Sequence, residues 1–146
     1  MNFPDQFLIR IVDARTRAPV PRLAMHIILV ARKKNNYTIP AVTNASGNVS
    51  LSKEGVRESI EEDWKISPMD YESGLEDCAP EPEIHICSSE DVQRSVAAMK
   101  LFGPTRTIST ELMRAFEESI NDRFSPTMKR INVEEMNPSE LEVEPK

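Results

Sequence analysis

Apolar and polar positions alternate along the first third of the chain, between Phe7 and Leu51. A period of two is typical of strands that bury one face, and the β-branched side chains here suit a pleated surface. Pro40 has no N–H to donate to a neighbouring strand, so its strand should lie at a sheet edge. Four short strands separated by turn residues predict a small β-sandwich or barrel. The predicted strands are residues 6–12, 22–32, 37–43 and 49–51.

Beyond the fourth strand the apolar spacing becomes that of a helix. Val56, Ile60 and Trp64 lie four residues apart and predict a short amphipathic helix over 53–66. Residues 83–88 alternate again and predict one more strand of the sandwich.

Two further helices follow in the sequence. Ser88 and Asp91 have the spacing of a capping box, which predicts a helix start, and Gly103 followed by proline predicts the end of that helix. A second amphipathic helix is predicted over 110–124. Because a sandwich has its own core, this helix needs a second surface, either the adjacent sheet or a neighbouring chain. Its apolar face consists of Leu112, Phe116, Ile120 and Phe124.

Together these elements predict a mainly β chain with added helices, of the α+β class. We expect a Greek-key-type β-sandwich with an inserted short helix at 1–88, and a helical extension packed on it at 89–126. Residues 127–146 form an acidic tail with five glutamates and few large apolar residues. This composition favours disorder or an extended partner-binding segment.

The turn residues between the first strands carry a resemblance to a known family. The order V-x-D-x-x-T-x-x-P-V-P, a long apolar strand and T-N-x-x-G-x-V resembles the transthyretin-like and carboxypeptidase regulatory-like β-sandwich domains. The resemblance implies that the Asp and Thr lie around the first turn and that the Gly precedes a strand with buried apolar residues. The usual Thr-Gly of that turn is Thr16-Arg17 here. The matching residues are Val12, Asp13, Thr16, Pro19, Val20, Pro21, Thr43, Asn44, Gly47 and Val49.

The formal net charge of −6 is distributed unevenly. Residues 1–53 hold eight basic and two acidic side chains, whereas the remainder holds ten basic and 22 acidic ones. This dipolar pattern is poorly suited to nucleic acid and suits head-to-tail contact with a second copy or an oriented protein partner. The alternative is that both halves only solvate their surfaces. The basic turn residues are Arg15, Arg17, Arg32, Lys33 and Lys34.

Composition also bears on location. No apolar run approaches the length of a membrane-spanning helix. The first residues, MNFPDQF, lack the layout of a signal peptide, so we expect a cytoplasmic protein or one exported without a classical signal. Two cysteines are too few for a disulfide framework.

Metal-ligand atoms gather in one short region. His85 and Cys87 alternate on the predicted strand at 83–88, with Cys78 upstream. They suggest a metal site, although the spacing lacks the paired C-x-x-C form of structural zinc sites. The alternative is a half-buried strand face with a small apolar Cys. The acidic loop at 70–83 either binds Ca²⁺ or is solvated.

Enzymatic motifs are missing from the sequence. Among transthyretin-like proteins, the hydroxyisourate hydrolases carry a catalytic His before the first V-L-D-like run and end in Y-R-G-S. Arg10 occupies the matching position here and the chain closes with LEVEPK, so the resemblance implies no such activity. No phosphate-binding loop or Ser-His-Asp layout is present either, and we predict no cofactor and identify no small-molecule substrate.

The sequence therefore predicts a non-catalytic interaction or structural subunit of a larger protein assembly, of the kind found in phage tails or secretion systems. Its contact surfaces would be the basic turns, the helix face at 112–124 and the acidic tail, binding a protein partner or a second copy. Two alternatives stay open. One is a small metal-dependent hydrolase using His85 and Cys87, and the other is a monomeric ligand-binding module.

Overall fold

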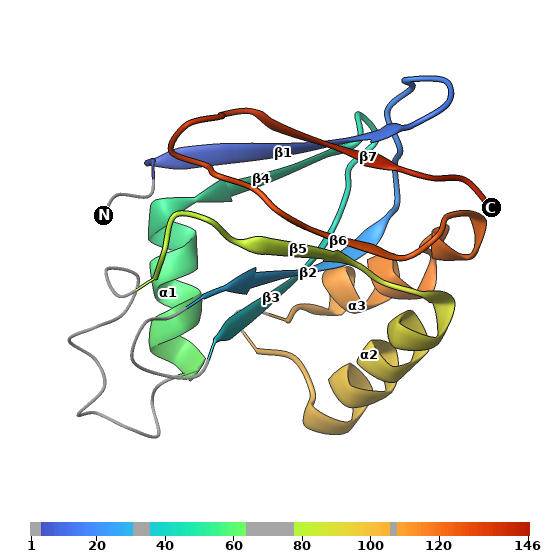
Figure 1. Ribbon diagram of the computed structural model, residues 1–146. Helices are drawn as coiled ribbons and strands as arrows, with labels where there is room; N and C mark the ends of the chain where they lie inside the picture. The colour runs from blue at the N-terminus through green and yellow to red at the C-terminus, as the bar shows by residue number, and fades with distance from the viewer. Residues whose placement is uncertain (1–3, 31–35, 64–77, 106–107) are drawn as a thin grey trace.

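The computed structural model describes residues 4–30, 36–63, 78–105 and 108–146, with the side chains of 60–63 excepted. Two mainly antiparallel sheets face each other and two helices cover the outer side of one of them (Figure 1). The predicted fold class, mainly β with added helices, is confirmed. In the part of the chain described, no helix is long and apolar enough to cross a bilayer.

The first sheet has three strands in the order β4-β1-β7. β1 pairs antiparallel with β4 and parallel with β7, so the first and last strands of the chain lie side by side. Phe7, Ile9 and Ile11 of β1 are buried and point toward the second sheet, as the alternation predicts. The strand bounds are β1 (Gln6–Asp13), β4 (Asn48–Ser52) and β7 (Ser139–Val143).

The second sheet has four antiparallel strands in the order β3-β2-β5-β6. Pro40 lies in β3 at the edge of this sheet, as predicted from its missing N–H. Met25, Ile27 and Leu29 of β2 are fully buried against the first sheet. The strand bounds are β2 (Ala24–Leu29), β3 (Tyr37–Val42), β5 (Glu83–Ile86) and β6 (Thr127–Arg130).

Residues 127–146 are part of the sandwich, so the expectation of a disordered or extended tail is wrong. β7 alternates, with Ser139, Leu141 and Val143 buried and two glutamates between them pointing outward. Arg17, in the turn after β1, donates hydrogen bonds to both carboxylates, Glu140 and Glu142. The acidic composition therefore belongs to the outer face of a strand.

The first turn and the turn before β4 pack against each other. The Asp13 carboxylate accepts hydrogen bonds from the backbone N–H groups of Arg15 and Thr16, at 2.7 and 3.1 Å. Arg17 has a φ of 64°, a left-handed conformation at the position where the resembled families carry glycine. Ile11 N–H donates to the carbonyl of Gly47 at 2.8 Å, which fixes the second turn on β1.

The helices fill the connections between strands. α1 (Lys53–Asp63) follows β4 directly and buries Val56 in the core, while Trp64 lies outside the described residues. In the sequence, α2 (Ser89–Phe102) and α3 (Thr110–Glu117) come between β5 and β6. They cover the outer face of the four-stranded sheet (Figure 1). A short 3-10 helix, η3 (Asn121–Arg123), leads into β6.

The second amphipathic helix is shorter than predicted, because tertiary contacts end it at Glu117. Ile120 N–H donates to the carbonyl of Arg22 at 2.9 Å instead of continuing the helix. The Asn121 side chain then bonds to the backbone of β2 and of Cys87. Phe116 packs with α2 on the outer side of the sheet, whereas Phe124 enters the core between the sheets.

Candidate functional site

α2 starts at the capping box that the sequence predicts. The Ser88 hydroxyl accepts a hydrogen bond from Asp91 N–H at 3.1 Å, and the Asp91 carboxylate accepts one from Ser88 N–H at 3.4 Å. Because Ser88 follows β5 closely, the box sets the direction in which the helix leaves the sheet. From this start the helix packs Val92 and Met99 in one cluster with Ala24 and Cys87 on the outer side of the sheet.

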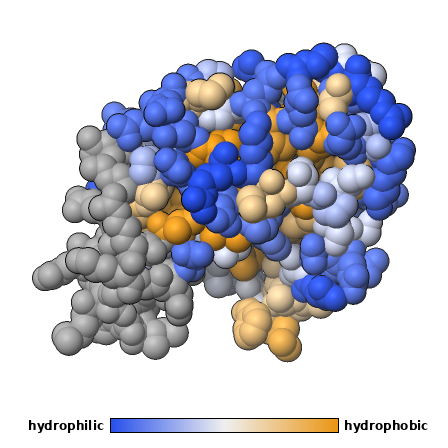
Figure 2. All heavy atoms as spheres, in the orientation of Figure 1, coloured by the Kyte–Doolittle hydropathy of each residue, from blue (hydrophilic) through white to orange (hydrophobic). Residues whose placement is uncertain are grey.

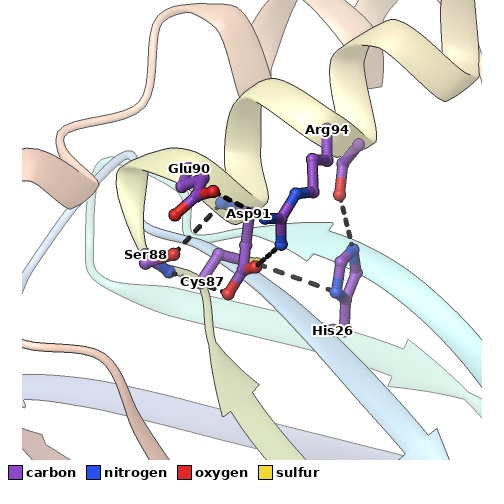
Figure 3. A network of polar contacts seen from close by, with 7 residues as sticks. His26, Cys87, Ser88, Glu90, Asp91 and Arg94 are labelled. Atoms are coloured by element: carbon purple, nitrogen blue, oxygen red, sulfur yellow. Dashed lines mark hydrogen bonds and ion pairs between the residues drawn. The ribbon is translucent and has the colours of Figure 1, made fainter.

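His26 connects the sheet to both helices, and Figure 3 shows its contacts with Cys87 and with α2. It lies on the outer face of β2, directly opposite His85 of β5. Its Nε2 lies 3.1 Å from the Ser95 hydroxyl of α2, and its Nδ1 lies 3.8 Å from the Cys87 thiol. The imidazole stacks on Phe116 of α3, with ring centroids 6.0 Å apart. Through this side chain, β2 contacts the residue that follows β5 and both helices.

Burial sets the protonation of this network. It lowers the pKa of His26 from 6.5, opposed by the Asp91 carboxylate and assisted by His85. It also raises the pKa of the Cys87 thiol to about 12, with a further contribution from Asp91. At pH 7 the Cys87 thiol is therefore held in its neutral form.

An open hollow of about 520 Å³ lies beside the network. Its charged groups are engaged with one another. The Arg94 guanidinium pairs with Glu90 at 2.5 Å and Asp91 at 3.5 Å, and His85 lies 3.1 Å from the Glu83 carboxylate. Among the described residues that line the hollow, Asp91, Arg94 and His85 each have such a partner.

The structure separates the three residues predicted to share a metal ion. His85 and Cys87 line the same hollow, on the outer side of the four-stranded sheet. Cys78 lies in the core between the two sheets. Within the described ranges, no group of three or more His, Cys, Asp and Glu side chains is arranged to hold a metal ion. The proposed Ca²⁺ loop falls mostly at 64–77, outside the described residues.

The predicted partner-binding residues are dispersed. Arg15 and Arg17 are exposed in the first turn, and Arg17 is paired with β7 of its own chain. Phe116 and Phe124 are buried within the chain, with Leu112 and Ile120 packed beside them. This helix face therefore covers the chain's own sheet, which is the first of the two alternatives that the sequence left open. Arg32, Lys33 and Lys34 lie outside the described residues.

A different apolar surface is exposed at the end of α2. Leu101 and Phe102 are 79% and 78% accessible, although the helix that carries them is packed on its other side by Val92 and Met99. Hydrophobic atoms protrude at the lower edge of the molecule in Figure 2, where α2 ends in Figure 1. The signal for this surface was present in the sequence as a second set of apolar positions at helical spacing.

Sequence reasoning also missed the roles of His26, Ser95 and Asn121. The pairing of His26 with His85 depends on the register between β2 and β5, which the sequence does not reveal. Asn121 is 2% exposed and bonds across 97 positions of sequence to Ala24. No local pattern marks such a contact in advance.

Comparison of the chain with models of known protein families and with curated proteins yields no match. The site must therefore be judged from its own geometry. The contacts of His26 hold the helices against the sheet, and Leu101 and Phe102 at the end of α2 are the most exposed large apolar residues in the described part of the chain.

Acidification is expected to destabilise the fold through His26. Because burial holds its folded-state pKa below 6.5, the unfolded chain binds more protons in the interval between the two values. Neutral His26 contributes its full stabilisation above about pH 6.5, and this contribution is lost as the pH falls toward the folded-state pKa of His26. Urea titrations should give a free energy of unfolding that decreases from about pH 8 to about pH 5.

The two histidines of the chain provide matched variants for this test. His26→Gln removes the titrating group and should flatten the dependence over the same interval. His85→Gln changes the residue directly opposite on β5 and should keep most of the wild-type slope, because burial lowers the pKa of His26 more than His85 does. An unchanged slope in His26→Gln would show that another group controls the response.

Proposed function

We propose that this protein is a non-catalytic interaction or structural subunit of a larger protein assembly. The observation that carries the proposal is the exposure of Leu101 and Phe102 on a well-formed helix end. Single exposed apolar residues are common, but two adjacent large ones on a rigid element mark contact surfaces. Their burial by a partner would remove apolar area from water at about 25 cal/mol per Å².

The chemistry of the polar hollow does not favour a hydrolase. Cys87 is held as a neutral thiol, and its hydrogen-bond partner His26 is already engaged with Ser95 and stacked on Phe116. A general base must reach a substrate proton, and this imidazole has both ring nitrogens occupied. The contacts of His26 with Cys87, Ser95 and Phe116 are better explained as structural contacts that hold the helices against the sheet.

The resemblance to transthyretin-like sandwiches supports the same proposal. The turn residues that carry it meet in one place, where Gly47 packs on Pro19 and Val20 and bonds to Ile11. Arg10, at the position of the hydrolase histidine, is exposed on β1. We therefore propose that this chain is such a sandwich with a non-catalytic role.

The proposal is tested by the native size of the chain in an extract of the cells that make it. We expect it to migrate well above its monomer mass of 16.6 kDa in size-exclusion chromatography, detected by antibody. Phe102→Glu should shift it toward the monomer position. Met128→Glu, at a 55% exposed apolar residue on β6, is the matched control and should leave the large form intact. A monomeric wild-type chain at its natural concentration would refute the proposal.

A further inference from the structure

α2 carries two stripes at helical spacing, and within the described part of the chain only one of them packs against another element. The buried stripe, Val92, Val96 and Met99, packs against the sheet and α3. The other stripe is solvent-exposed and apolar over the last two turns of the helix. Its positions follow the i, i+3, i+4, i+7, i+8 pattern by which one helix packs on another. The exposed stripe consists of Arg94, Ala97, Ala98, Leu101 and Phe102.

The stripe is complementary to itself when two copies run antiparallel. A twofold axis that passes between positions 99 and 100 places Leu101 of one copy level with Ala98 of the other. The same axis places Phe102 level with Ala97. Each large side chain then meets a small one, so the two helices approach closely without clash. A parallel arrangement would instead set large against large.

Charge supports the same direction. The carbonyls of Lys100 and Leu101 lack their helical donors, because Pro104 has no N–H and Thr105 N–H donates to Ile108 at 2.6 Å. The end of α2 therefore carries the negative pole of the helix dipole. In the antiparallel arrangement the Arg94 guanidinium lies level with this end of the other copy. Its five donors allow a contact there in addition to its pairing with Glu90.

We infer that the partner of this surface is a second copy of the chain, bound through antiparallel contact of the two α2 stripes. The inference rests on the proposed function and names the partner that it requires. A contact made by one helix from each copy falls below about 1,200 Å², the size range of reversible associations. The dimer should therefore form over micromolar concentrations.

Sedimentation velocity of the purified full chain tests the inference, from about 1 µM to about 500 µM. We expect the weight-average mass to rise from monomer toward dimer over this range. Leu101→Glu and Phe102→Glu should each weaken dimerisation at least about tenfold. Both residues are exposed in the monomer, so these variants should fold normally, which circular dichroism checks. Met128→Glu should dimerise like the wild type.

Cross-linking tests the direction of packing. Chains with Ala98→Cys and chains with Leu101→Cys are mixed and treated with a short bismaleimide. Antiparallel contact predicts more cross-linked dimer in the mixture than in either variant alone. Parallel contact would give efficient cross-linking within each variant, and it would overturn the arrangement.

The outcomes separate this inference from the proposed function. A purified chain that stays monomeric at every concentration overturns the second-copy partner. If that same chain is part of a large species in the cell extract, the proposed function stands with a foreign partner. A dimer that Phe102→Glu leaves intact would place self-association on another surface and would also overturn the inference.

Discussion

Replacing Gly47 by alanine is expected to lower the free energy of unfolding by about 4 kcal/mol, one of the largest effects of a single methyl group in this chain. Gly47 has a φ of 76°, which strains any side-chain-bearing residue. An added Cβ would lie 2.8 Å from the Pro19 Cβ and 2.9 Å from both the Ile11 carbonyl and the Val20 nitrogen. Two of these neighbours are backbone atoms, so the turn and β1 would have to separate.

Gly103 provides the matched control. It has the same φ of 76°, but nothing lies within 4 Å of the position that a Cβ would take. Gly103→Ala therefore carries the backbone strain alone, at a cost of about 1–3 kcal/mol. Urea titrations of both variants measure the difference, which is the contribution of close packing between the two turns. Equal losses would show that the turn contact relaxes easily.

Replacing Asn121 by alanine is expected to cost about 4 kcal/mol. The side chain is 2% exposed and makes three hydrogen bonds. Its Oδ1 accepts from Ala24 N–H at 2.8 Å, and its Nδ2 donates to the Ala24 and Cys87 carbonyls at 2.9 and 2.7 Å. Removing it leaves one buried N–H and two buried carbonyls without these bonds, where water cannot readily replace them.

Asn132→Ala is the control for this prediction. The Asn132 side chain also accepts two backbone hydrogen bonds, from Glu134 and Glu135, but in an exposed turn. Water can replace those bonds, so the expected loss is at most about 1 kcal/mol. Asn121→Asp should be nearly as damaging as Asn121→Ala, because a carboxylate would face two carbonyls. A small effect of Asn121→Ala in urea titrations would show that the site collapses or admits water.

The strands of the first third were predictable because each has one apolar face and ends at a strong turn signal. β1 illustrates this, since Phe7, Ile9 and Ile11 alternate without interruption and are all buried. β7 has the same alternation, with Ser139 and two apolar residues pointing inward. The glutamates of β7 made the segment look like an acidic tail and hid this alternation. β7 also pairs with a strand that is 130 positions away in the sequence, since Ser139 lies opposite Ile9 of β1. Pairing over such a distance leaves no local trace in the sequence.

The candidate site was less predictable than the fold. The helix face at Phe116 was found correctly as amphipathic, but its partner surface is the chain's own sheet. The exposed stripe at Leu101 was hidden because α2 has apolar residues on two sides, and composition alone does not say which side meets the sheet. That choice depends on the capping geometry at Ser88 and on the position of His26, both of which are tertiary facts.

The parallel pairing of β1 with β7 bears on how the chain is made. A ribosome adds about 5–20 residues per second, so β1 waits on the order of ten seconds before its neighbour in the sheet has been synthesised. Until then β1 has only β4 beside it, and one side of its backbone is open to pairing with other chains. Protection of that nascent edge, by a chaperone or by rapid packing of β1 and β4 on the second sheet, is thus a requirement of biosynthesis that the finished molecule no longer displays.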